Sequence, residues 1–387
     1  MVVPFAARVV AAVVGVLLVT TSASSVIGTL IVPRSVSSWL TKRIDRIVDV
    51  GFILATKWVK DFHRRDRILA AQAATLLLCQ LIGWLSIFFV GFALIFWPLV
   101  HGGITDAFSA AGPGLWQIGE DRARGGLQQA ILDVAALSGL ITITLQIAYL
   151  PTLYSEFNRR ENEVALLNSR GGVPSWGPEL LARTHYALGS GTSTLNTLPG
   201  LYIQWERWAA DVAESHTTYL PLVRFRSPLP YSSWVISLLA VLDSAALMLV
   251  LAPEQAPVVA ARLCLRGGFS CLGRVARAMG LDVPMEADPE AGITLTYDEF
   301  LEAISRLEEV GFQITREASD AWPEFVGWRV NYESAAYQIA AAIDAVPALW
   351  SGPRRQAETE MAPLRPPSGR QRARQQRAAD DGTIGHK

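Results

Sequence analysis

The side chains best suited to chemistry in this sequence are two carboxylates and an imidazole that lie close together. Asp211, Glu214 and His216 occur within a stretch of helical periodicity, and the spacing of the two acids places them on one side of a helix. Such a set could bind a metal or exchange protons between a carboxylate and an imidazole. A solvated helix face with a histidine near its end is the commoner role for this pattern, and we favour it.

The cysteines do not form a framework for metal binding or for disulfides. Of the three cysteines, Cys79 lies in an apolar run, and Cys264 and Cys271 lie in a basic amphipathic segment without CxxC or Cys/His spacing. Zinc ligation requires convergent donors, so we expect no metal and no cofactor. A nucleotide-binding glycine loop and a nucleophile elbow are also absent from the sequence. We therefore expect that the protein is not an enzyme.

Three long apolar segments dominate the first 150 residues. They cover residues 9–32, 68–100 and 130–150, and each is long enough to cross a bilayer. A signal peptide is the alternative for the first segment, because Arg8 precedes it and small residues interrupt it at Ser22 to Ser25. The apolar run resumes after these serines and stops only at Pro33, which favours a retained span. The hydrophobic content of 51% fits a membrane protein, and a net charge of −1 gives no reason to expect a nucleic-acid partner.

The charges between the spans predict a topology. Nine lysines and arginines lie between Arg34 and Arg67, whereas the loop 101–127 has only Arg122 and Arg124. The positive-inside rule therefore places residues 34–67 and 151–387 in the cytoplasm of a multi-pass cell-membrane protein. Residues 34–67 alternate basic and apolar side chains. They could lie in the headgroup plane of an anionic leaflet or form an ordinary connector with solvated charges.

The loop between the second and third spans, with the helix that follows it, resembles a known family. The relevant motifs are IVPR at residues 31–34, IAYLPTLYSEFNRRE from residue 147 and VALLNSRGGVPSWGPELLAR from residue 164. In these motifs the chain, over roughly its first 180 residues, resembles actinobacterial membrane proteins related to two-helix, pore-loop potassium channels. The resemblance implies a homo-oligomer that conducts monovalent cations. It also implies that residues 101–127 re-enter the membrane as a short helix, Asp106 to Ala111, followed by a filter of backbone carbonyls.

The filter positions depart from the family pattern Thr-Leu-Gly-Phe-Gly-Asp. The aligned pore-loop residues are Gln117, Ile118, Gly119, Glu120 and Asp121. The last two replace the aromatic residue and the second glycine, and Pro113 interrupts the pore helix. A potassium filter needs glycine where other residues resist the backbone geometry, so we expect at most a weak preference for cations, from a ring of Glu120 and Asp121 carboxylates. The alternative is a non-conducting scaffold or sensor in which these two acids lie on an exposed loop.

The remainder of the chain predicts a linker, a helical cytosolic domain and a tail. Residues 171–200 are rich in Gly, Pro, Ser and Thr, which indicates a linker around one short helix at 178–186. Residues 201–350 predict a mainly helical domain with a strand-like segment at 293–297, in which Thr296 caps the next helix. The Pro-, Arg- and Gln-rich tail 351–387 is expected to be disordered.

One apolar segment in this domain, residues 233–252, has two interpretations. Its length suits a fourth span, but Asp243 at its centre would cost about 2.5–3.5 kcal/mol to insert. We favour a buried central helix in which Asp243 pairs with a basic residue or caps a neighbouring helix. The sequence thus predicts an all-α membrane protein with three transmembrane helices, a re-entrant-like loop between the second and third, and a mainly helical cytosolic domain.

Overall fold

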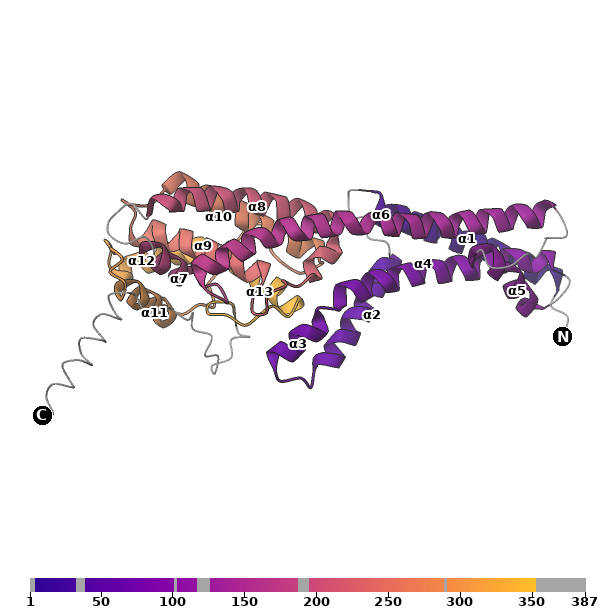
Figure 1. Cartoon of the computed structure of the whole chain (residues 1–387), viewed down its shortest axis with the longest axis horizontal. Helices are drawn as coiled ribbons and strands as arrows, with labels where there is room; N and C mark the ends of the chain where they lie inside the picture. Colours follow the sequence, from indigo (N-terminus) through magenta and orange to yellow (C-terminus); the bar gives the residue numbers. More distant parts are fainter. Residues whose placement is uncertain are drawn as a thin grey trace, which may run out of the picture.

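The computed structural model describes residues 4–32, 39–100, 103–116, 126–186, 195–288 and 291–352, and all the regular structure in these ranges is helical. An elongated part and a helical bundle are joined by one long helix, α6 (Figure 1). The elongated part consists of α1 (Phe5–Leu30), α2 (Trp39–Thr56), α3 (Phe62–Leu69), α4 (Gln72–Phe96), η1 (Trp97–Leu99), α5 (Ile104–Trp116) and α6 (Gly126–Gly171). The bundle consists of α7 (Gly177–Tyr186), η2 (Leu195–Thr197), α8 (Leu198–Thr218), η3 (Leu220–Arg224), α9 (Trp234–Leu251), α10 (Val258–Ala278), α11 (Tyr297–Glu308), α12 (Ala318–Arg329) and α13 (Glu333–Ala342).

Four helical stretches in the described ranges are long and apolar enough to cross a membrane. Three of them, α1, the stretch 62–99 and α6, match the predicted apolar segments and have less than half of their apolar windows buried inside the protein. The fourth, α9, is entirely buried by other parts of the chain. The first three therefore offer an apolar surface to their surroundings, whereas α9 offers none.

α1 and α4 cross closely because glycine lies on both helices at the contact. A Cβ atom added to Gly15 would lie 2.5 Å from the carbonyl oxygen of Gly91. Hydrogen bonds accompany this approach: the Trp84 indole donates to Ser25 Oγ at 3.0 Å, and Ser22 Oγ donates to the Trp84 carbonyl at 3.3 Å. Small residues and interhelical hydrogen bonds of this kind are what hold helices together where apolar burial cannot.

α5 contains the predicted short helix and extends beyond it. It spans Ile104–Trp116, so the expectation that Pro113 interrupts it is wrong. Proline removes one backbone donor, and the burial of Ala107 and Ala111 against neighbouring helices stabilises the continued helix. The ring of Phe108 lies 5.4 Å from that of Phe89. Because Phe89 is seven residues, or about 10 Å, before the end of α4, α5 runs back along α4 rather than away from it.

α6 is one unbroken helix of 46 residues, although it contains Pro151, and proline within a helix often ends or kinks it. Tyr149 and Leu153, on either side of this proline, are buried in one cluster with Leu77 of α4 and Leu222 of η3. This packing offsets the hydrogen bond that proline removes. The apolar first half of α6 and its charged second half therefore form a single rod that enters the bundle.

The bundle packs around α9 and includes residues that were expected to form a linker. α7 matches the predicted short helix, and its Leu180 and Leu181 are fully buried in the same core as α9. A Cβ atom on Gly177 would lie 2.6 Å from that of Asp243, so only glycine allows this close approach. The strand-like segment 293–297 is not a strand, although Thr296 does cap α11 in a capping box with Glu299.

Candidate functional site: the junction between the elongated part and the bundle

The predicted pore-loop residues lie outside the described ranges. Gln117, Ile118, Gly119, Glu120 and Asp121 fall between Trp116, the last residue of α5, and Gly126, the first residue of α6. Their roles remain predictions from the sequence.

The predicted set Asp211, Glu214 and His216 does not come together. His216 is fully buried, Glu214 is exposed, and the half-exposed Asp211 forms an ion pair with Arg159 at 3.4 Å. In the described part of the chain no three His, Cys, Asp or Glu side chains form a group that could hold a metal ion. The imidazole belongs instead to the inside of a junction.

The centre of this junction is a short segment, residues 219–226, which contains η3. We call it the junction segment. It lies against the bundle-side end of α4 and the middle of α6: Leu222 contacts the cluster of Leu77, Tyr149 and Leu153, and the ring of Tyr219 lies 5.5 Å from that of Tyr149. The junction segment is therefore packed between the elongated part and the bundle.

Arg160 of α6 fixes the junction segment from the inside. Its Nη1 donates to the Leu222 carbonyl at 2.8 Å, and its Nη2 donates to the Phe225 carbonyl at 2.7 Å. Its Nε donates to Glu161 at 2.8 Å, and Nη1 also lies 3.0 Å from His216 Nε2. Burial lowers the pKa of Arg160 and the adjacent Glu161 opposes this. A guanidinium remains charged throughout the physiological range, so the charge is held by one carboxylate and fixed carbonyl dipoles.

His216 is held neutral in this environment. Burial and the nearby Arg160 guanidinium place the pKa of His216 well below its ordinary value. An arginine only donates, so Nε2 accepts from Arg160, and the ring proton must lie on Nδ1, 3.0 Å from Ser215 Oγ. The Ser215 hydroxyl in turn donates to the Asp211 carbonyl at 2.8 Å. A proton added to His216 would face Arg160 directly.

We expect acid to destabilise the wild-type protein through His216. Below about pH 6.5, the ordinary pKa of histidine, the unfolded chain binds a proton at His216 that the folded chain does not, so the free energy of unfolding falls as pH falls. Above that pH the free energy of unfolding contains the full contribution of neutral His216. Below it, the free energy of unfolding falls by up to about 1.4 kcal/mol per pH unit. Chemical denaturation at several pH values should show a shallower acid dependence for His216→Gln. His63→Gln, which removes an exposed imidazole, should retain the wild-type slope; equal slopes for wild type and His216→Gln would refute this assignment.

Two arginines of the junction segment reach the helices α2 and α3. Arg224 forms a two-point contact with Asp49, with Nε and Nη2 at 2.9 and 2.6 Å from its two oxygens. Arg226 pairs with Asp66 and also donates to the carbonyls of Ile343 and Asp344 after α13, at 2.9 and 3.1 Å. Fork geometry of this kind fixes orientation as well as distance.

A third ion pair completes the link, because Arg65 of α3 lies 2.6 Å from Asp344. One short segment thus contacts α2, α3, α4, α6 and the end of α13. A displacement of any of these elements would change the contacts of the others.

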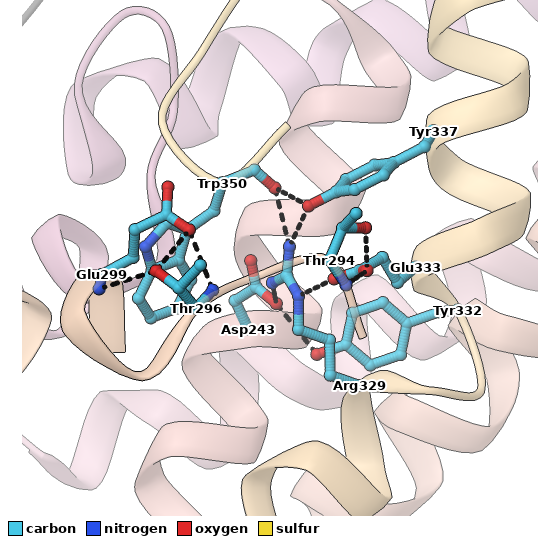
Figure 2. A network of polar contacts seen from close by, with 9 residues as sticks. All are labelled: Asp243, Thr294, Thr296, Glu299, Arg329, Tyr332, Glu333, Tyr337 and Trp350. Carbon is cyan, nitrogen blue, oxygen red and sulfur yellow. Dashed lines mark hydrogen bonds and ion pairs between the residues drawn. The ribbon is translucent and has the colours of Figure 1, made fainter. Parts of the chain in front are cut away.

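A second buried polar network lies within the bundle (Figure 2). Arg329 forms ion pairs with Asp243 and with Glu333, the latter at 2.6 Å, which confirms that Asp243 pairs with a basic residue. The Tyr332 hydroxyl also donates to Asp243 at 2.9 Å, and Glu333 accepts hydrogen bonds from the backbone and hydroxyl of Thr294. The network ties α9 to α12 and α13, and so to the residues directly after α13 that accept hydrogen bonds from Arg226.

The four arginines that organise both networks, Arg160, Arg224, Arg226 and Arg329, were not predicted as functional residues from the sequence. The signal for them is weak: Arg224 and Arg226 lie in the otherwise apolar stretch LPLVRFRSPLP, and Arg329 lies in an aromatic one.

Comparison of the chain with protein-family models, with curated proteins and with solved structures finds no match.

Proposed function

We propose that the protein is an integral membrane protein with three spans, α1, α4 and the first half of α6, and a cytoplasmic bundle. The exposed apolar faces of these helices support the proposal, and the complete burial of α9 argues against a fourth span. On this orientation α5 re-enters from the outer end, beside α4. The basic α2–α3 pair then lies at the cytoplasmic end, in agreement with the positive-inside rule.

Within this topology, we infer a channel-like homo-oligomer, weakly selective for monovalent cations, with the bundle as its regulatory domain. The observation that carries the inference is the unbroken course of α6 from the proposed span to Arg160, where it holds the junction segment. A rigid helix of this kind transmits movement of the bundle to the membrane. The alternative is a non-conducting membrane scaffold or sensor. It is favoured by Glu120 and Asp121, which stand where the family pattern has an aromatic residue and the second glycine of the filter.

Conductance distinguishes the two functions. After reconstitution into planar bilayers, wild-type protein should give a current with a weak preference for cations and no strong preference for potassium over sodium. The double variant Glu120→Gln/Asp121→Asn should lose the cation preference, because the carboxylate ring is removed. Glu254→Gln/Asp282→Asn removes the same charge from the bundle and should not change it. Strong potassium selectivity would mean that the filter lies in other residues, and the absence of any current from inserted protein would favour the scaffold.

Cysteine labelling tests the topology. In a background without Cys79, Cys264 and Cys271, an impermeant thiol reagent added outside intact cells should modify Thr105→Cys, at the exposed start of α5. It should not modify Ser305→Cys or Ser319→Cys, which are exposed on the bundle, until the membrane is opened. Labelling of either bundle position from outside would contradict the proposed orientation.

A further inference from the structure

Helix α2 turns its two acidic side chains toward the rest of the protein and leaves its three basic side chains exposed. Its only acids face the protein: Asp45 accepts a hydrogen bond from Gln80 Nε2 at 2.9 Å, and Asp49 accepts one from Gln72 Nε2 at 2.9 Å. Asp49 also holds Arg224 of the junction segment. The inward face of α2 is therefore satisfied by α4 and by the bundle.

The outward face of α2, taken as its exposed residues, contains three basic side chains and no acid. Lys42, Arg43 and Arg46 are exposed, and none of them forms an ion pair within the ranges that the structure describes. The Arg43 guanidinium lies 5.1 Å from the centre of the Trp39 ring, which is itself exposed. This face would attract an anionic partner and repel a cationic one.

The same face also exposes large apolar side chains. Their exposed fractions are Trp39 72%, Ile47 69%, Val50 49%, Ile53 63% and Leu54 60%. A soluble protein rarely leaves such a group together on one helix. A mixture of cationic and apolar side chains without acids matches the headgroup region of an anionic membrane, where the charges meet phosphates and the apolar groups reach the acyl chains.

The position of α2 on α4 is consistent with this location. Ile44 contacts Gly83, and the hydrogen bonds to Gln80 and Gln72 lie about one and three turns before it, toward the start of α4. A hydrocarbon core of about 30 Å takes about 20 residues of helix, so a span that ends outside near Leu99 reaches the inner headgroups near Gln80. The basic side chains lie within one turn of Asp45, at this level. From there, α2 and α3 run at an oblique angle to α1 and α6 (Figure 1).

We propose that the outward face of α2 binds the anionic lipids of the inner leaflet. The inference rests on the proposed membrane location and adds a partner that the location alone does not require, since a span needs no particular headgroup charge. Asp49 on the inward side of the same helix holds Arg224, so lipid binding that positions α2 also positions the junction segment.

The test compares two lipids on the full chain. Detergent-solubilised protein is titrated with phosphatidylglycerol or phosphatidylcholine, and the relative affinities are measured by native mass spectrometry. Wild type should prefer the anionic lipid. Each basic residue near the surface contributes about fivefold, so the triple variant Lys42→Gln/Arg43→Gln/Arg46→Gln should lose on the order of a hundredfold of this preference.

The matched control removes the same charge from the bundle. Arg262→Gln/Arg266→Gln/Arg277→Gln neutralises three exposed arginines of α10 and should retain the wild-type preference. Circular dichroism of both variants verifies that the helices are intact. Equal affinities of wild type for the two lipids, or equal losses in the two triple variants, would overturn the proposal.

Three further outcomes distinguish this proposal from its alternatives. If Val50→Gln/Leu54→Gln reduces the oligomer mass without changing the lipid preference, the face is a contact between copies of the chain and the lipid proposal fails. Inserted protein that has the proposed topology but no lipid preference contradicts only this inference. Wild-type protein that does not insert into vesicles contradicts both this inference and the proposed function.

Discussion

Replacing Arg329 with methionine is expected to lower the free energy of unfolding of the bundle by about 3–5 kcal/mol. The guanidinium is completely buried between Asp243 and Glu333 and also donates to the Trp350 carbonyl and the Tyr337 hydroxyl at 2.7 Å each. Removing it leaves two buried carboxylates without a counter-ion. The loss of stability comes mainly from these two unpaired buried carboxylates. The lost attraction contributes less, because in the wild-type protein it is largely offset by the desolvation of the charged groups.

Thermal unfolding in detergent measures this effect. A loss of this size in a domain of this length corresponds to a fall in Tm of roughly 6–20 °C. The triple variant Arg329→Met/Asp243→Asn/Glu333→Gln should recover part of the loss, because amides leave no buried charge unpaired. Arg316→Met, which removes an exposed pair with Glu324, should cost less than about 1 kcal/mol. A triple variant as unstable as Arg329→Met alone would show that charge is not the cause.

The destabilisation of Arg329→Met is expected to depend on pH through the carboxylates that lose their counter-ion. In the wild-type protein, attraction by Asp243 raises the pKa of Arg329 well above its usual range, so the guanidinium stays charged. Burial raises the pKa of Asp243 and Arg329 opposes this, so loss of Arg329 raises the pKa of Asp243 further. The folded variant then binds a proton that the unfolded chain releases near neutrality, and its free energy of unfolding falls as pH rises. The destabilisation should therefore be smaller at pH 6 than at pH 8.

Replacing Arg160 with methionine is the second large change, and we expect it both to destabilise the protein and to release the junction segment. The variant leaves the carbonyls of Leu222 and Phe225 and the carboxylate of Glu161 without the donor that they share. Removing one partner of a buried charged contact of this kind lowers the free energy of unfolding by about 3–5 kcal/mol. Unlike Arg329, Arg160 connects two parts of the molecule, so its loss should also loosen the contact between α6 and the bundle.

Limited proteolysis separates release of the segment from simple unfolding. Arg224 and Arg226 are trypsin sites whose side chains are largely covered in the folded protein. In Arg160→Met these sites should be cut at a temperature where the bundle core remains folded. Arg159→Met is the matched control, because the neighbouring Arg159 is half-exposed and pairs only at the surface with Glu156 and Asp211. Uncut sites in a destabilised Arg160→Met variant would mean that the segment is held by packing alone.

The helical elements follow largely from the sequence. The three apolar segments, the short helix at 178–186 and the cap at Thr296 are local features, because apolar length and capping side chains act within a few residues. Prolines were less informative. Pro113 indicated a break, yet α5 continues through it, and α6 likewise continues through Pro151, because buried residues near each proline offset one lost hydrogen bond.

The sequence by itself determined that Asp243 needs a partner, because a carboxylate at the centre of an apolar helix is costly wherever that helix lies. It could not determine that Arg329, 86 residues away, is that partner. The same holds for Arg160, which stands beside the surface residue Arg159 in the sequence but is buried against the junction segment. Periodicity specifies which side of a helix is apolar, whereas the folded chain decides which charged side chain is enclosed. The junction therefore exists only in the tertiary structure, since its contacts join residues that lie far apart along the chain.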